Sequence, residues 1–167
     1  MDNFYKKMKV IKNYLEESIF KEIQTMVFSS HFPLYYNDYV ADSSDHSDFM
    51  FTHYFYANEK QNSDFMGSIV LPILGKLKYK KLLRAKLNCY TKKDKHIYTP
   101  FHKDLDYAHQ VALFSLNTCN GFTYFKNKNK QIKSVENQMI IFDGLKEHCS
   151  VNQTDTNLRI NININYI

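Results

Sequence analysis

The chain has 167 residues and a mass of 19.9 kDa, and because that length can bury one substantial hydrophobic core but hardly two, we predict a single domain over residues 1–167. Its hydrophobic share of 44% and aromatic share of 16% exclude a largely disordered protein. The net charge of +5 comes from 20 Lys and only two Arg spread along the chain, a pattern that indicates a solvated lysine surface more than a stripe for nucleic acid.

The N-terminal segment, residues 1–12, carries charged side chains throughout, and no apolar run in the chain approaches the roughly 20 residues that cross a bilayer. We therefore expect no membrane partner. Cys89, Cys119 and Cys149 are odd in number and far apart, so they indicate neither a disulfide framework nor a zinc knuckle. A reducing cytoplasm, of a bacterium or of a host cell if the chain is viral, is the expected compartment.

The first half of the chain is predicted to be mainly helical. Apolar residues at helical spacing, with Lys and Glu between them, predict an amphipathic helix over residues 4–28. An extended segment follows at 32–36, and the Asp- and Ser-rich residues 42–48 are typical of a loop. Residues 49–56 predict a strand, and residues 66–83 predict a second helix despite a Pro and a Gly within it.

From residue 84 onward the pattern changes to short runs rich in β-branched and aromatic residues, separated by turn-forming pieces such as Asn120-Gly121. The predicted strands cover residues 84–90, 109–118, 122–126, 131–135, 139–143 and 158–167. Strands of this number and spacing are typical of a sandwich, jelly roll or barrel. We therefore predict a mainly β fold with flanking helices, in which residues 84–167 form the core and residues 1–83 supply helices and supporting strands.

The last predicted strand has one wholly polar and one wholly apolar face, because residue types alternate along it. The polar face carries Arg159, Asn161, Asn163 and Asn165, and the apolar face carries Ile160, Ile162, Ile164 and Tyr166. We expect the polar face to line a wet site at Arg159 and Asn161 and to meet solvent at Asn165. In a chain so rich in Lys, the two arginines, Arg84 and Arg159, are expected where a planar, bidentate fork is needed.

A candidate metal-binding pair lies at His102 and Asp104, two residues apart. On an extended segment both side chains project to the same face and can share one ion. Two histidines and one carboxylate on one face of an octahedral ion are typical of non-haem iron(II) oxygenases, so a third ligand is needed from elsewhere. The pair alone is weak support, because the chain contains a second such pair, His46 and Asp48, inside a polar loop.

The order of later polar residues strengthens the first pair. His148 lies 46 residues after His102, just beyond a predicted strand, and Arg159 begins the last strand 11 residues later. In this order the sequence resembles the 2-oxoglutarate and iron(II)-dependent oxygenase superfamily over residues 84–167. The resemblance implies a double-stranded β-helix, a jelly-roll or cupin-like core, with N-terminal helices packed against it. It also implies iron ligands at His102, Asp104 and His148 and a 2-oxoglutarate contact at Arg159.

Further residues match the family's pattern around 2-oxoglutarate. Asn88 and Tyr90 stand on the strand before the metal pair, and Asn161 shares a strand face with Arg159. Residues 120–125 are similar to the family's Gly-containing turn and Thr-x-Phe segment. The resemblance implies that Fe(II), 2-oxoglutarate and O2 are used together, that succinate and CO2 are released, and that a substrate C–H bond is hydroxylated.

Within the superfamily the chain looks most like the small prolyl-hydroxylase-like group, which implies a peptide, protein or small amino-acid substrate. An alkylated-nucleic-acid demethylase is the alternative, since Asn88-x-Tyr90 and Arg159-x-Asn161 also resemble that group. Its members usually carry a second Arg six residues after the first, where this chain has Asn165, which weakens this alternative. A non-catalytic β-barrel binding protein is a third hypothesis, because each polar residue taken singly could also be an ordinary surface or core residue.

Overall fold

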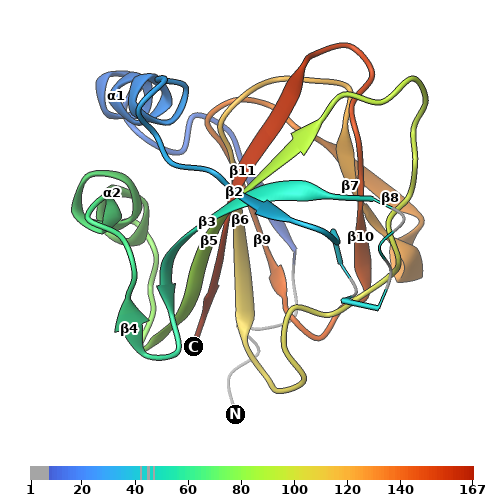
Figure 1. Cartoon of the computed structure of the whole chain (residues 1–167). Coiled ribbons are helices and arrows are strands. Elements are labelled where there is room, and N and C mark those ends of the chain that lie inside the picture. Colours follow the sequence, from blue (N-terminus) through green and yellow to red (C-terminus); the bar gives the residue numbers. More distant parts are fainter. Residues whose placement is uncertain (1–7, 42, 45, 47) are drawn as a thin grey trace.

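The computed structural model describes residues 8–41, 43, 44, 46 and 48–167 (Figure 1). The strands are β1 (Lys9–Ile11), β2 (Tyr35–Asn37), β3 (Met50–Ala57), β4 (Lys60–Gln61), β5 (Leu82–Thr91), β6 (Gln110–Ser115), β7 (Phe122–Phe125), β8 (Lys130–Lys133), β9 (Gln138–Asp143), β10 (His148–Val151) and β11 (Leu158–Tyr166). The helical elements are α1 (Glu17–Val27), the π-helix η2 (Met66–Val70), α2 (Leu71–Leu74) and the 3-10 helix η3 (Lys126–Lys128).

The strands form two antiparallel sheets. The larger sheet has the order β1-β9-β6-β11-β5-β3-β2, with β4 paired to β3, and the smaller has the order β10-β7-β8. Between the two sheets, apolar side chains of β6 and β9 pack against those of β7 and β8. These side chains are Val111, Leu113, Phe125, Ile132, Ile140 and Phe142. The arrangement is the predicted mainly β, jelly-roll architecture.

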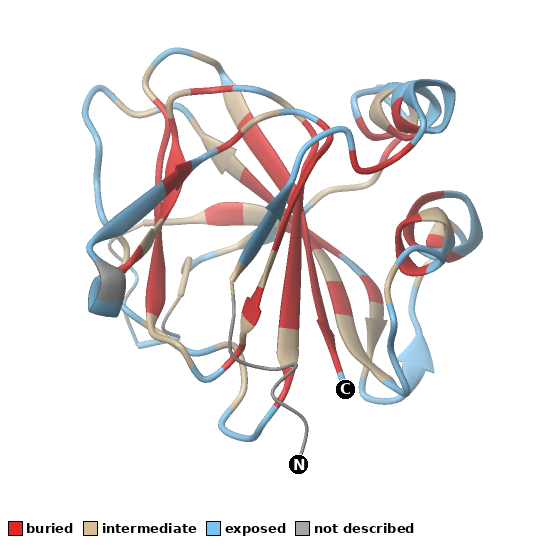
Figure 2. Ribbon diagram, turned by 180° about the vertical axis from the view of Figure 1, so that it is seen from behind, coloured by how far each residue is buried: buried red, intermediate tan, exposed pale blue. Residues whose placement is uncertain are grey.

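Helices α1 and α2 cover the outer face of the larger sheet (Figure 1). Their buried side chains and those of the sheet form one core, to which α1 gives Phe20, Ile23 and Val27, α2 gives Ile73 and Leu74, β5 gives Ala85, Leu87 and Cys89, and β11 gives Ile160, Ile162 and Ile164. Figure 2 shows the buried residues concentrated along the strands. Each large apolar side chain buried there contributes roughly 1.5–3 kcal/mol, so this layer holds the sheet in place while its other face remains available for a polar site.

The polar face of β11 points between the two sheets, as its alternation predicted. β11 is a central strand, since it pairs with β5 on one side and with β6 on the other. One expectation was wrong, because Asn165 is 0% exposed and does not meet solvent. Sheet pairing on both sides and the loop above the strand exclude water from this position, and Asn165 instead donates a hydrogen bond to Asp104.

The first helix is shorter than predicted. Residues 1–7 lie outside the described part of the chain, and Val10 and Ile11 belong to β1, where they pair with β9. Asn13 has a φ of 48°, a left-handed conformation that interrupts any helix, so α1 begins only at Glu17. The apolar spacing around Val10 and Ile11 therefore belongs to a β-branched edge strand and not to the helix.

The second predicted helix also ends early, at Leu74, because it consists of the π-helical turn η2 followed by the short α2 with Pro72 in its first turn. The predicted loop at 42–48 is partly described: residues 43, 44, 46 and 48 lie in turns or irregular structure, and residues 42, 45 and 47 lie outside the described part. Strand β10 was not predicted at all. None of the helices that the described residues form is long and apolar enough to span a membrane.

Candidate metal centre

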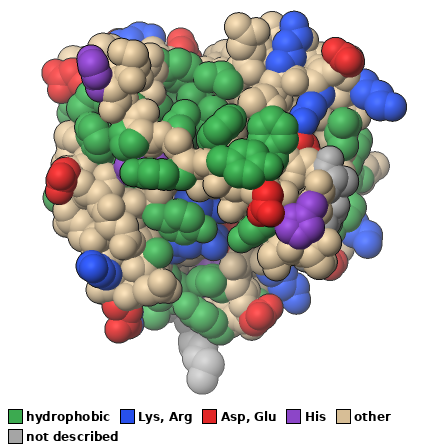
Figure 3. Space-filling model, in the orientation of Figure 1, with side chains coloured by type: hydrophobic (Ala, Val, Ile, Leu, Met, Phe, Trp, Pro, Cys, Tyr) green, Lys and Arg blue, Asp and Glu red, His purple; other side chains and the backbone are tan. Residues whose placement is uncertain are grey.

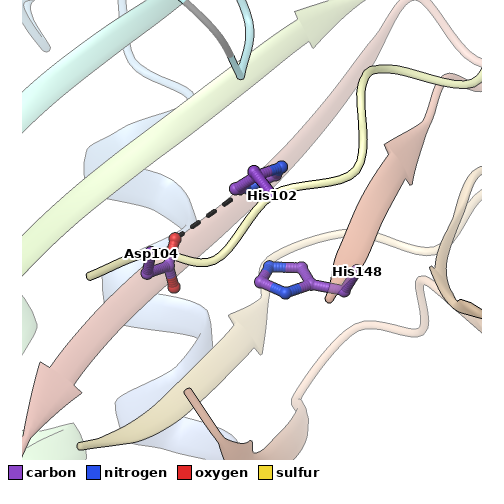
Figure 4. Close-up of side chains that lie close together, drawn as sticks. All are labelled: His102, Asp104 and His148. Carbon is purple, nitrogen blue, oxygen red and sulfur yellow. Dashed lines mark ion pairs between the residues drawn. The ribbon is translucent and has the colours of Figure 1, made fainter. Parts of the chain in front are cut away.

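His102 and Asp104 lie on the loop between β5 and β6, and His148 is the first residue of β10. The loop is tied to β10 by a reciprocal pair of backbone hydrogen bonds, from His102 N to His148 O (3.0 Å) and from His148 N to His102 O (3.1 Å). One side-chain ligand atom from each of the three residues lies within 4.8 Å of the others. Figure 4 shows the three side chains gathered at one place, with the carboxylate of Asp104 facing His102.

The surroundings of both histidines leave Nε2 available to a metal. Nδ1 of His102 lies 3.2 Å from the carbonyl oxygen of Pro100, and Nδ1 of His148 lies 3.0 Å from that of Lys146. Because a carbonyl oxygen only accepts, each Nδ1 must carry the proton, which leaves Nε2 able to bind a metal. Burial lowers the pKa of His102, and the neighbouring His148 lowers it further while Asp104 opposes the shift. A neutral imidazole is the form that ligates metals.

Asp104 is fixed by three donors from the sheet. Its Oδ2 accepts hydrogen bonds from Asn163 Nδ2 (3.1 Å) and Asn165 Nδ2 (3.0 Å), and its Oδ1 lies 3.1 Å from Arg84 Nη2. Arg84 is held in turn, since its Nε donates to Asn165 Oδ1 (2.9 Å). Burial alone would raise the pKa of Asp104, but His148, Arg84 and the two amides outweigh it and hold the pKa below its usual value. The carboxylate is therefore ionised and oriented.

Arg159 lies at the other end of the polar face, 2% exposed. Its Nη1 donates to Ser150 Oγ (2.6 Å), its Nη2 donates to Thr123 Oγ1 (3.2 Å), and its guanidinium carbon lies 5.2 Å from the centre of the Tyr90 ring. Among the described residues no carboxylate pairs with Arg159, and its Nε has no hydrogen-bond partner. A buried charge without a counter-ion destabilises a fold by several kcal/mol, so we expect an anionic ligand to bind this guanidinium.

The surroundings of Arg159 leave space and polar groups for such a ligand. Asn88 Nδ2 donates to Asn161 Oδ1 (3.1 Å), and the buried Oδ1 of Asn88 has no hydrogen-bond partner in the described structure. A Cβ at Gly121 would lie 2.8 Å from Arg159 Cδ and 3.1 Å from a backbone oxygen, so any side chain at this position would clash with the arginine. The Asn120-Gly121 turn predicted from the sequence therefore also clears room for the guanidinium.

All seven predicted site residues line one cavity between the two sheets. The cavity also contains residues that the sequence interpretation missed, namely Lys86, Thr123, Ser150 and Asn163. Thr123 and Asn163 lay within segments already singled out, but only the pairing of strands shows which way they face. Burial, helped by the charge of Arg84 and opposed by that of Asp104, lowers the pKa of Lys86 to about 8.

The second His-x-Asp pair is not part of this centre. His46 Nδ1 lies 3.2 Å from Asp38 Oδ2 on the surface, and Asp48 forms an ion pair with Lys93 and accepts a hydrogen bond from the Phe49 backbone (2.8 Å). Within the described part of the chain, His102, Asp104 and His148 form the one group of three His, Cys, Asp or Glu residues whose ligand atoms converge.

No protein-family model and no curated protein matches the sequence, but solved structures match the fold over nearly its whole length. A viral collagen prolyl hydroxylase from Paramecium bursaria Chlorella virus-1, solved with 2-oxoglutarate, has a TM-score of 0.60 at 14% identity, covering 97% of each chain. An oxidoreductase of the 2OG-Fe(II) oxygenase family from Burkholderia pseudomallei has a TM-score of 0.66 at 12% identity, covering 95% of this chain and 83% of that one.

A third similar structure is the non-haem α-ketoglutarate-dependent epimerase SnoN from nogalamycin biosynthesis, with a TM-score of 0.64 at 11% identity, covering 98% of this chain and 78% of that one. The fold of this chain is thus similar both to a hydroxylase and to an epimerase. This chain therefore has the fold of the 2-oxoglutarate and Fe(II)-dependent oxygenases, as its sequence resemblance implied.

Proposed function

We propose that this chain is a dioxygenase that uses Fe(II), 2-oxoglutarate and O2, with the iron held by His102, Asp104 and His148. The observation that carries the proposal is the combination of these three ligands with Arg159 in one cavity. Three such ligand atoms lie within 4.8 Å of one another, and an iron ion that they held would have further positions for 2-oxoglutarate and O2. Arg159 supplies a buried cation without a carboxylate partner among the described residues, as the distal carboxylate of 2-oxoglutarate requires.

The position of each residue in the cavity would decide whether it binds the metal or the co-substrate. The two Nε2 atoms and the ionised carboxylate of Asp104 hold the metal, because their other polar atoms are occupied by backbone carbonyls and by Asn163, Asn165 and Arg84. Ser150 and Thr123 hold the guanidinium of Arg159 in the lining of the cavity.

Tyr90, Asn88 and Asn161 line the path between Arg159 and the metal ligands. In that position they would orient 2-oxoglutarate and exclude bulk water from the space around it. Bound Fe(II) would supply O2 activation coupled to the decarboxylation of 2-oxoglutarate to succinate and CO2, with oxidation of a substrate C–H bond.

We propose a peptide, protein or amino-acid substrate and hydroxylation as the reaction. The support is the similarity of fold to the viral collagen prolyl hydroxylase. Because an epimerase has a similar fold, the fold alone does not determine the reaction, and the reaction has to be tested. The experiment compares succinate release in the presence of Pro-containing peptides and of methylated oligonucleotides. We expect stimulation by peptides, and stimulation by the oligonucleotides alone would contradict the proposed substrate class.

An alkylated-nucleic-acid demethylase is the second candidate, and one contact favours it. The second Arg typical of that group is replaced by Asn165, but Arg84 on the neighbouring strand donates to Asn165 Oδ1 and so brings a guanidinium to the same place. The chain therefore has the cation that its sequence lacked at position 165. The oligonucleotide arm of the experiment above tests this candidate directly.

The proposed activity is tested by conversion of labelled 2-oxoglutarate to labelled succinate by the Fe(II)-loaded protein. We expect release that depends on iron and is lost in His102→Ala. Asp48→Ala is the matched control, because it removes a carboxylate from the second His-x-Asp pair and should retain the release. Equal release by the wild type and His102→Ala would contradict the proposal.

A further inference from the structure

Lys86 is a cation in the cavity that the proposed iron and 2-oxoglutarate contacts do not use. It lies on β5 with its ammonium 5.6 Å from the centre of the Tyr54 ring on β3. In the described part of the chain, Lys86 has no hydrogen bond and no ion pair, although it lines the same cavity as the metal ligands. Figure 3 shows Lys and Arg side chains at the bottom of a hollow with hydrophobic side chains around it.

Asp104 does not serve as the missing partner of Lys86. Its Oδ2 already accepts from Asn163 and Asn165, and its Oδ1 is paired with Arg84. Coordination of a metal would occupy the carboxylate further. An ammonium that lines the cavity and whose nearest carboxylate is already occupied can take its counter-ion from a ligand.

Lys86 does not lie beside Arg159 on the sheet. Arg159 pairs across the sheet with Tyr90, and Lys86 lies four residues away on the same face of β5, about 13 Å along the strand. Lys86 pairs instead with Asn163, which holds Asp104, so along the strand it lies level with that metal ligand.

Charge balance also leaves Lys86 without a counter-ion. With Fe(II) and doubly charged 2-oxoglutarate bound, the charges of the metal, Asp104, the co-substrate and Arg159 cancel. Arg84 and Lys86 then remain as two cations without compensating anions on the same side of the centre. An anionic group brought by the substrate would offset this charge at the place where the substrate must lie.

A groove of about 850 Å³ lies next to this position, and Tyr54 and Arg84 are among the residues that line it. Tyr54 contacts Lys86 and Arg84 contacts Asp104, so two residues of the groove touch two residues of the metal cavity. Its volume is within the range of about 300–1,000 Å³ that small-molecule sites occupy. A substrate lying in the groove would therefore place its inner end beside Lys86.

We propose that Lys86, with Arg84 beside it, binds a carboxylate of the oxidised substrate within a few bonds of the carbon that reacts. The substrate is then a carboxylic acid, either a free amino acid or an acidic residue within a peptide. This inference rests on the proposed oxygenase function and adds the substrate class. Lys86 is the residue that selects an acid over the corresponding neutral amide, because its ammonium pairs with the carboxylate and gains nothing comparable from an amide.

The experiment uses the full chain loaded with Mn(II) and 2-oxoglutarate, whose binding is measured first. Free L-amino acids and their carboxamides, and short peptides carrying Asp or Glu against Asn or Gln, are then titrated by calorimetry. We expect at least one acid to bind about 10- to 100-fold more tightly than its amide. A preference confined to free acids identifies an amino-acid substrate, and a preference among the peptides identifies an acidic side chain.

Three variants make the role of Lys86 specific. Lys86→Met should remove the preference for the acid while keeping affinity for 2-oxoglutarate, Lys86→Arg should keep most of the preference, and Lys78→Met, at an exposed lysine, should leave it unchanged. The proposal is overturned if the wild type binds no acid better than its amide, or if the preference persists in Lys86→Met. Failure of the wild type to bind Mn(II) and 2-oxoglutarate would instead overturn the proposed function.

Discussion

Replacement of Arg159 by Lys separates 2-oxoglutarate binding from metal binding. The guanidinium is held by Ser150 (2.6 Å) and Thr123 (3.2 Å) and stacks over Tyr90. Lysine keeps the charge but loses the planar fork that forms two parallel hydrogen bonds with a carboxylate. Loss of one charge-assisted hydrogen bond, about 1.5–3 kcal/mol, corresponds to about 10- to 100-fold weaker 2-oxoglutarate binding.

The assay is calorimetric titration of 2-oxoglutarate into Mn(II)-loaded protein, with the Mn(II) affinity measured separately. Arg159→Lys should weaken 2-oxoglutarate and leave Mn(II) binding largely intact. Arg84→Lys is the matched control, because Arg84 contacts Asp104 and its replacement should instead weaken Mn(II) binding. If Arg159→Lys folds normally and binds 2-oxoglutarate as tightly as the wild type, the co-substrate is held elsewhere and the role given to Arg159 is wrong.

Three further changes have defined outcomes. Gly121→Ala places a Cβ 2.8 Å from the Arg159 side chain, so it should weaken 2-oxoglutarate and lower the free energy of unfolding by about 1–3 kcal/mol in urea. Gly67→Ala has no atom within 4 Å and should show neither effect, and similar losses in both variants would contradict the steric argument. Asp104→Ala should abolish the Mn(II)-induced rise in Tm while the circular dichroism spectrum is retained; a persistent rise would place the metal elsewhere. The pKa of Lys86, about 8 in the folded chain against an ordinary value of 10.5, means that between these pH values the unfolded chain holds more protons. Wild-type stability relative to Lys86→Met should therefore rise, by up to about 3 kcal/mol, from pH 8 to pH 10.5, and a flat difference would contradict the lowered pKa.

Local periodicity predicted most of the strands and the polar face of the last one, whereas the choice of His148 and the roles of the site residues came from the resemblance to the oxygenase superfamily. The strict alternation in β11 placed Arg159 and Asn161 on one face, because a strand repeats every two residues whatever its neighbours are. The two-residue spacing of His102 and Asp104 likewise brought them to one side of an extended loop. These are short-range properties, and they require no knowledge of which strands pair.

The remaining contacts depend on pairings between distant segments. Arg84 reaches Asp104 because Arg84 stands opposite Asn165 in the register of β5 and β11, 81 residues apart. Ser150 reaches Arg159 only because β10 lies in the second sheet, across the cavity from β11. Asn165 was expected in solvent because its strand was not known to be central. Local patterns in a single sequence do not show which distant strands pair or in which register.

The central claim is that one centre binds iron and 2-oxoglutarate together, and anaerobic titration with both tests it most directly. Chelation of Fe(II) by the keto acid in this protein should produce a weak visible metal-to-ligand absorption that saturates with 2-oxoglutarate. The band should be absent in His102→Ala and retained in Asp48→Ala, whose carboxylate lies outside the centre. A wild-type protein without the band, or a band that survives in His102→Ala, would contradict the account.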